Sequence, residues 1–288
     1  MANQMNDPLK GDKKPSGATL KTVIPRLRAM LRDFLLCLAF FTRLPVSLSF
    51  EQPADMSKSS RMFPATGLII GGIGSLAMAV AWLLGLPVIA VSVLAVATMI
   101  LATGALHEDG LADMVDGFGG GRDRMRKLEI MKDSHIGTYG VLALVLSQGL
   151  RISLLSALIS ADLIIAMAAL TGSAVASRAA SMVFWSALPP ARKDGLSRDV
   201  GQPDRAALTF AMAMTLIVLL AVLWWSAGPA ALVAAVVVSG LSIWLLIGLC
   251  HHQIGGQTGD TIGAAQQISE LAFMAGLLMS VGNIVDLT

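Results

Sequence analysis

The stretch AALTFAMAMTLIVLLAVLWWSAGPAALVAAVVVSGLSIWLLIGLC, from Ala206 to Cys250, decides the fold of this chain. No Asp, Glu, Lys or Arg occurs between Ala206 and Gly259, and a second stretch without these residues runs from Met62 to Leu106. A helix that crosses a membrane needs about 20 predominantly apolar residues. Each stretch therefore predicts two spans joined by a tight turn.

The whole chain has the composition of a membrane protein. Its 288 residues are 55% hydrophobic and only 14% charged, with a mean hydropathy of +0.71, whereas soluble domains carry about 25% charged residues. Lipid admits only helices or closed barrels, and the sequence lacks the alternating pattern of barrel strands. We therefore expect an all-α fold, a polytopic transmembrane helical bundle.

We expect about seven spans and one shorter helix. The spans are predicted at Pro64–Gly85, Pro87–Leu106, Gly137–Ser160, Asp162–Leu188, Ala207–Ser226, Pro229–Cys250 and Ile268–Asp286. Leu31–Leu44 is apolar but too short to span, which predicts an N-terminal interfacial or re-entrant helix. Residues 1–28 are expected to form a disordered polar tail, and residues 29–288 a single transmembrane catalytic domain.

Basic residues are distributed unevenly over these spans. With the N-terminus inside, the turns at Gly85–Pro87, Ser160–Asp162 and Ser226–Pro229 fall outside, and none carries Lys or Arg. This is the positive-inside pattern, and it predicts a cytoplasmic N-terminus. Of 21 Lys and Arg residues, only Arg151 and Arg178 lie within spans. Such charges usually face the bundle interior, although Arg178 lies near enough to the inner end to snorkel to water.

The segment HEDGLADMVDGFGGG, from His107 to Gly121, contains four carboxylates within nine residues. Asp109, Asp113 and Asp116 follow the spacing i, i+4, i+7, which places them on one face of a helix. Three carboxylates on one face repel one another, and oxygen ligands of this kind suit Mg²⁺, Mn²⁺ or Ca²⁺. The pattern predicts a metal site, with a solvated acidic face at the membrane boundary as the alternative.

Two neighbouring features indicate a phosphate-bearing substrate. The acids are followed by glycines, which allow close backbone approach, and by basic side chains that suit phosphate oxygens, at Arg122, Arg124, Arg126 and Lys132. The positive-inside pattern alone is the alternative explanation for these basic residues. Farther along, GGQTGDTIGA contains Asp260, and Gly255 and Gly256 could form an anion-binding nest or a plain inter-helix turn. The predicted topology puts Asp260 on the same side as the acidic cluster.

Four blocks of this sequence resemble adenosylcobinamide-GDP ribazoletransferase, a family also called cobalamin-5'-phosphate synthase. They are FFTRLPV at Phe40–Val46, RMFPATGLIIG at Arg61–Gly71, the run HEDGLADMVDGFGGGRDRMRKLEIMKDSHIGTYGVLAL from His107, and GGQTGDTIGA at Gly255–Ala264. They occur in the family's order and cover most of the chain from about residue 35. In that family an apolar residue often stands where this chain has Glu108.

The resemblance implies a late step of cobalamin biosynthesis at the bacterial cell inner membrane, and the predicted topology puts the active site on the cytoplasmic side. Adenosylcobinamide-GDP would react with α-ribazole or its 5'-phosphate to give adenosylcobalamin or its 5'-phosphate and GMP, with Mg²⁺ as cofactor. No nucleic-acid partner is expected. In the bilayer the protein could form a homo-oligomer or bind other cobalamin-assembly enzymes.

We combine the residues and the resemblance in one hypothesis for the site. Asp109, Asp113 and Asp116 bind Mg²⁺, and Asp116 or Asp133 accepts the proton of the attacking hydroxyl. Asp260 supplies a further contact to metal or hydroxyl. The phosphate oxygens are held by Arg122, Arg124, Arg126, Lys132, Gly255 and Gly256. The alternatives are a cation transporter that uses the Asp cluster, and a membrane scaffold for other cobalamin enzymes.

Overall fold

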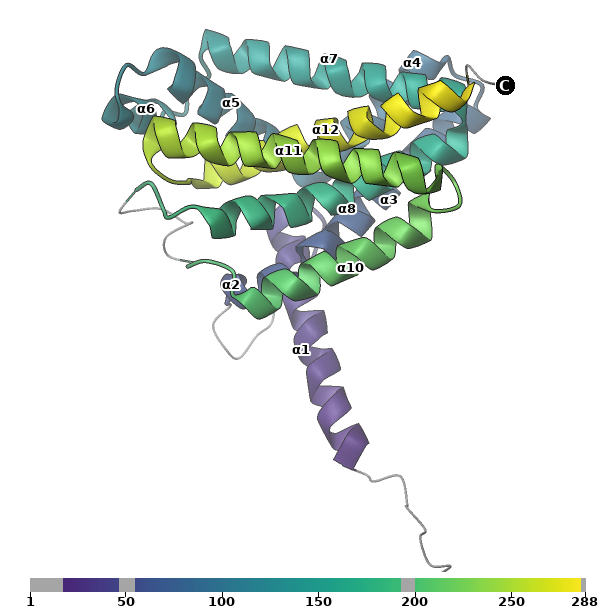
Figure 1. Ribbon diagram of the computed structural model, residues 1–288, viewed down its shortest axis with the longest axis horizontal. Coiled ribbons are helices and arrows are strands. Elements are labelled where there is room, and N and C mark those ends of the chain that lie inside the picture. Colours follow the sequence, from purple (N-terminus) through teal and green to yellow (C-terminus); the bar gives the residue numbers. More distant parts are fainter. Residues whose placement is uncertain (1–17, 47–54, 193–199, 286–288) are drawn as a thin grey trace, which may run out of the picture.

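The computed structural model describes residues 18–46, 55–192 and 200–285, and these residues form a helical bundle (Figure 1). Its principal helices are α1 (Ala18–Phe41), α3 (Phe63–Leu83), α4 (Val88–Thr103), α5 (Leu106–Gly120), α7 (Thr138–Ala161), α8 (Leu163–Ala187), α10 (Arg205–Leu223), α11 (Gly228–Ile254) and α12 (Gly259–Val285). Short helices occur at α2 (Met56–Ser59), η1 (Ser60–Met62) and α6 (Arg124–Ile130). The all-α prediction is confirmed.

Six helices of the described residues are long and apolar enough to cross a membrane, or seven if the bent pair α4–α5 counts as one span. The expected number of about seven spans agrees with this range. Helices α8 and α12 lie in the middle of the bundle, while α7, α10 and α11 turn much of their apolar surface outward. That outward surface matches lipid, because side chains such as Ile217, Val233 and Trp244 are more than 60% exposed.

The expected span Pro87–Leu106 corresponds to α4 alone. Helix α4 ends at Thr103, and Gly104 and Ala105 both adopt positive φ values, of 64° and 60°. This left-handed conformation is common for Gly but costly for Ala. The chain resumes as α5 at an angle of 89° to α4. Therefore α5, which carries the acidic cluster, runs across the end of α4 instead of continuing it.

Two helices begin earlier than the sequence predicted. Helix α1 starts at Ala18 and ends at Phe41, so it is longer than the expected Leu31–Leu44, and it projects from the bundle (Figure 1). The first 17 residues of the expected tail lie outside the described residues. Helix α12 starts at Gly259, nine residues before Ile268, because Thr258 and Thr261 cap it reciprocally and its polar first half finds partners inside the bundle.

Candidate active site

Helix α5 brings the acidic cluster against α12. The two helices approach so closely at Gly110 that a Cβ atom there would lie 2.8 Å from the carbonyl oxygen of Asp260. Asp109 and Asp260 consequently line one cavity of about 390 Å³, together with Arg192. The structure thus brings together the two acidic motifs that the predicted topology had placed on one side.

The carboxylates at this end of the bundle are mutually repulsive. Asp113 is half-buried, and its carboxylate interacts electrostatically with those of Asp109, Asp116 and Asp260. Arg192 offsets part of this charge, because its Nη2 atom lies 3.4 Å from Oδ2 of Asp260. The Thr258 hydroxyl donates to the same oxygen at 3.2 Å. These carboxylates therefore carry more negative charge than Arg192 alone can neutralise.

Arg192 is a site residue that sequence reasoning did not single out. It follows Pro189–Ala191, a segment held beside the α11–α12 turn by two backbone hydrogen bonds. Ala191 N–H donates to Gln257 O at 2.8 Å, and Gln257 N–H donates to Pro189 O at 2.9 Å. A Cβ atom on Gly256 would lie 2.3 Å from Pro189 O. The structure therefore gives Gly256 a packing role in this pairing, while Gly255, at φ +67°, ends α11.

Asp116 lies apart from the cavity that Asp109 and Asp260 line. It is buried, and both of its oxygens accept backbone hydrogen bonds, from Gly137 N–H at 2.7 Å and from Gly140 N–H at 2.8 Å. These donors belong to the beginning of α7, where an anion is stabilised by unpaired N–H groups and the helix dipole. Asp116 therefore ties α5 to α7, a role different from the expected metal ligand or base.

The predicted phosphate-binding residues separate into two groups. Arg124 and Lys132 line a second cavity of about 450 Å³, and Arg192 borders both cavities. Arg124 also donates to Ala191 O at 2.9 Å. By contrast, Arg126 pairs with Glu129 at 3.2 Å on the exposed surface, and the exposed Arg122 lines neither cavity.

Asp133, one of the two residues expected to accept a proton, lies in an exposed loop and lines neither cavity. It accepts hydrogen bonds from the ring of His135 at 2.7 Å and from the backbone N–H of His135 at 3.0 Å. These two bonds, the ring's being the stronger influence, lower the pKa of the Asp133 carboxyl. A carboxylate with a lowered pKa is a weaker base, so its position and chemistry both disfavour the expected role.

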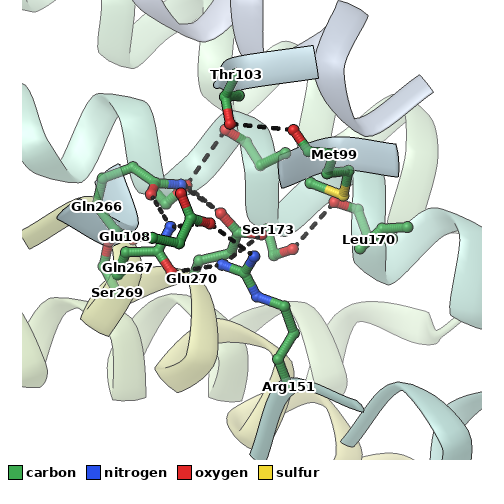
Figure 2. Close-up of polar contacts among 12 residues, drawn as sticks. Met99, Thr103, Glu108, Arg151, Leu170, Ser173, Gln266, Gln267, Ser269 and Glu270 are labelled. Carbon is green, nitrogen blue, oxygen red and sulfur yellow. Dashed lines mark hydrogen bonds and ion pairs between the residues drawn. The ribbon is translucent and has the colours of Figure 1, made fainter. Parts of the chain in front are cut away.

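Behind the cavities, a buried network of charged and amide side chains joins α5, α7 and α12 (Figure 2). Arg151 lies 3.5 Å from Glu108 and 3.4 Å from Glu270, and it donates to Gln267 Oε1 at 2.9 Å. The Nε2 group of Gln267 donates to Glu108 Oε1 at 3.1 Å. The side chain of Arg151 is 2% exposed, so the expectation that it faces the bundle interior is confirmed.

Arg178 completes this network from α8. It is also 2% exposed and donates to Ala174 O at 2.8 Å, so the snorkelling alternative is wrong. Its charge interacts with both Glu270 and Glu108. Two arginines therefore face two glutamates inside the bundle. Charges within predicted spans were the sequence signal for this network, and they singled out Arg151 and Arg178. Glu270 carried the same signal, because it lies within the predicted span Ile268–Asp286, but sequence reasoning did not use it.

The donor set at the cavity suits a hard divalent cation. Within the described residues, no three His, Cys, Asp or Glu side chains are gathered closely enough to hold a metal ion by themselves. Mg²⁺ is usually bound through one or two carboxylates, several waters and substrate phosphates. Asp109 and Asp113 can supply the carboxylates, and their repulsion would be relieved by a cation. The residues present therefore fit a magnesium ion that is shared with a substrate.

These features define a class of protein: a polytopic membrane enzyme with acidic and basic side chains around two cavities at one end of the bundle. The cobalamin-5-phosphate synthase family model matches residues 33–278. The chain is 43% identical to the adenosylcobinamide-GDP ribazoletransferase of Azorhizobium caulinodans over 259 residues, covering 87% of this chain and 96% of the relative.

Two further relatives are also described as adenosylcobinamide-GDP ribazoletransferases. The chain is 44% identical to the Mesorhizobium japonicum protein over 247 residues, covering 86% of this chain and 93% of the relative. It is 41% identical to the Brucella canis protein over 254 residues, covering 87% of this chain and 98% of the relative. No solved structure matches the fold. The chain belongs to the cobalamin-5-phosphate synthase family and is a transferase of late cobalamin biosynthesis. None of these comparisons supports the transporter alternative.

Proposed function

We propose that this enzyme joins adenosylcobinamide-GDP to α-ribazole, or to α-ribazole 5'-phosphate, with Mg²⁺ as cofactor. The products are adenosylcobalamin, or its 5'-phosphate, and GMP. The observation that supports this proposal is the meeting of Asp109, Asp260 and Arg192 around one cavity, with Asp113 near enough to interact electrostatically with all three. Carboxylates, an arginine and a shared cation are the groups that phosphoryl transfer requires.

In the proposed reaction, the nucleoside hydroxyl attacks the phosphorus that carries the cobinamide alcohol. A new P–O bond forms, the bridging P–O bond of the diphosphate breaks, and GMP leaves with that bond's electron pair. Asp260 accepts the hydroxyl proton, because it lines the cavity and is oriented by Thr258 and Arg192. When bound, Mg²⁺ neutralises charge on the diphosphate.

The basic side chains position the anionic parts of the substrates. Arg192 borders both cavities, so it can contact a diphosphate that extends from one into the other. Arg124 and Lys132 line the second cavity and would hold the GMP end. Arg122 and Arg126 are exposed and line neither cavity, and in this proposal they contribute to membrane orientation.

A GMP-release assay with adenosylcobinamide-GDP, α-ribazole and Mg²⁺ tests the function. We expect GMP release that stops with chelator and returns with added Mg²⁺. Asp113→Asn should lower release at least a hundredfold, roughly the loss expected for a group that acts on the reacting centre, while thermal unfolding stays near the wild-type temperature. Chelator-resistant turnover, or full activity of Asp113→Asn, would refute the proposed metal site.

We further propose that the protein is a multi-pass inner-membrane protein with its N-terminus and active site in the cytoplasm. The end that holds the cavities also holds the exposed basic residues of α6, and the turn after α10 carries no Lys or Arg. Both native cysteines are buried, so an introduced surface cysteine can be labelled selectively. In intact cells, a membrane-impermeant maleimide should label Trp225→Cys and spare Arg122→Cys. The reverse pattern would overturn this orientation.

A further inference from the structure

The cavity beside the carboxylates is also lined by a group of aromatic rings. The rings of Phe63 and Trp185 are nearly parallel, with an interplanar angle of 14° and centroids 6.2 Å apart. Those of Phe41 and His107 are stacked at 16° and 5.4 Å, and Phe41 meets Phe63 edge-on at 4.6 Å. All four residues line the cavity. They form one packed aromatic surface, and the phosphoryl transfer proposed above gives this surface no role.

This wall contains a hydrogen-bond donor without a partner. Trp185 is 4% exposed, and its indole Nε1–H has no hydrogen-bond partner among the described residues. The Nε–H of Arg192, which borders the same cavity, likewise has none there. Buried donors are nearly always satisfied in native structures, and the N–H of a buried Trp usually finds an acceptor. Both N–H groups are covered by protein atoms in this structure, so a ligand acceptor reaches them only when the two side chains turn toward the cavity that they line.

The size and polarity of the cavity select between the two substrates of the proposed function. A volume of about 390 Å³ is at the small end of ligand pockets, and a corrin ring with its amide side chains is much larger. Guanine has donors and acceptors along its edges that would need several polar partners, and of the four rings only Trp185 and His107 carry a polar atom. The benzimidazole base of α-ribazole is planar and largely apolar, and it has one free acceptor nitrogen.

We propose that this cavity is the nucleoside subsite. Its aromatic wall takes a planar apolar heteroaromatic base, and Trp185 Nε1–H donates to the base's acceptor nitrogen. The ribose then extends toward Asp260 and Arg192, where its hydroxyl can attack the diphosphate. This inference rests on the proposed function for its ligand, and it adds a residue, Trp185, that selects the base.

The first test is equilibrium binding of α-ribazole to the full-length protein in chelator, where no turnover occurs. Trp185→Phe keeps an aromatic ring but loses the donor together with one of the two fused rings, so we expect at least roughly tenfold weaker binding, the scale of one lost hydrogen bond. Trp244→Phe, at an outward-facing position that is 68% exposed, is the matched control and should bind as the wild type does. Unchanged α-ribazole affinity in Trp185→Phe would overturn the proposal.

The second test uses the wild-type protein, and so does not depend on the folding of a variant. The α-riboside of 5,6-dimethylindole differs from α-ribazole only by a C–H in place of the acceptor nitrogen, and it should bind the wild type about as weakly as α-ribazole binds Trp185→Phe. Trp185→Phe should cause no further loss with this analogue. Equal wild-type affinity for the two ribosides would overturn the assigned hydrogen bond.

Steady-state kinetics separate this subsite from the proposed function. Trp185→Phe should raise the KM for α-ribazole about tenfold and leave the KM for adenosylcobinamide-GDP unchanged. A raised KM for adenosylcobinamide-GDP alone would place that substrate in the cavity and refute the subsite. If the wild-type protein released no GMP, the proposed function would fail, while the binding measurements in chelator would still decide whether the cavity takes the nucleoside.

Discussion

Replacing Arg151 with Met should destabilise the protein more than any change to its surface charges. Arg151 is 2% exposed and lies 3.5 Å from Glu108 and 3.4 Å from Glu270. The substitution keeps a long side chain but leaves two buried carboxylates that share only Arg178. Breaking a buried ion pair by removing one partner costs about 3–5 kcal/mol. For a chain of this size, that loss corresponds to a melting temperature lower by roughly 6–20 °C.

A second substitution tests whether charge balance is the reason. In the double variant Glu108→Leu/Arg151→Met, one glutamate and one arginine are removed together, and Glu270 remains with Arg178. Replacing both members of a buried pair with apolar residues is often neutral or stabilising. We therefore expect the double variant to recover at least half of the melting temperature that Arg151→Met loses.

The measurement is thermal unfolding of the purified protein in detergent. Arg126→Met is the matched control, because its pair with Glu129 is exposed and such pairs contribute about 0–1 kcal/mol. If Arg151→Met had the melting temperature of the wild type, the buried network would not stabilise the bundle. If the double variant melted as low as Arg151→Met, lost packing would explain the effect, and the charge-balance argument would be refuted.

Three further substitutions test the roles assigned around α5. Asp116→Asn removes a charge-assisted acceptor from the start of α7, so it should lower the stability by about 1.5–3 kcal/mol, and an unchanged melting temperature would contradict the anchor role. Asp133→Asn should keep the wild-type rate of GMP release, because Asp133 is exposed and contacts His135; a large loss would return Asp133 to the site. Gly110→Ala would place a Cβ atom 2.8 Å from Asp260 O, and the displaced helix should release GMP roughly ten- to a hundredfold more slowly, with Gly149→Ala, in open space, as the control.

The spans could be predicted because the lipid environment imposes a simple rule on sequence. Uncharged apolar stretches of sufficient length become helices, and the two stretches between Met62 and Leu106 and between Ala206 and Gly259 did so. The same rule could not predict where α4 ends. The bend depends on the positive φ angles of Gly104 and Ala105, and Ala105 has no preference for that conformation. Contacts of the surrounding helices, which a single sequence does not display, decide that turn.

The residues that complete the candidate site were harder to predict, because long-range pairing brings them there. Arg192 is one of several basic residues in its loop, and only the backbone pairing of Ala191 with Gln257 places it beside Asp260. Trp185 looks like any aromatic residue of a buried helix. Its unpartnered N–H becomes informative only when the cavity is known. Asp260 was predictable because topology alone fixes the end of the bundle on which it lies.

The acidic cluster shows why a shared helical face is not yet a shared site. Asp109 and Asp116 lie on one face of α5, yet seven residues correspond to about 10 Å along a helix axis. Two oxygens bound to the same Mg²⁺ ion lie at most about 4 Å apart, twice the metal–oxygen distance. Asp109 and Asp113, about 6 Å apart along the axis, can converge on one cation when their side chains bend together. Asp116 lies only about 4.5 Å beyond Asp113 along the axis, but both of its oxygens accept hydrogen bonds from the first N–H groups of α7. The spacing of this cluster therefore serves two purposes: the proposed cation site at one end of α5 and a helix junction at the other.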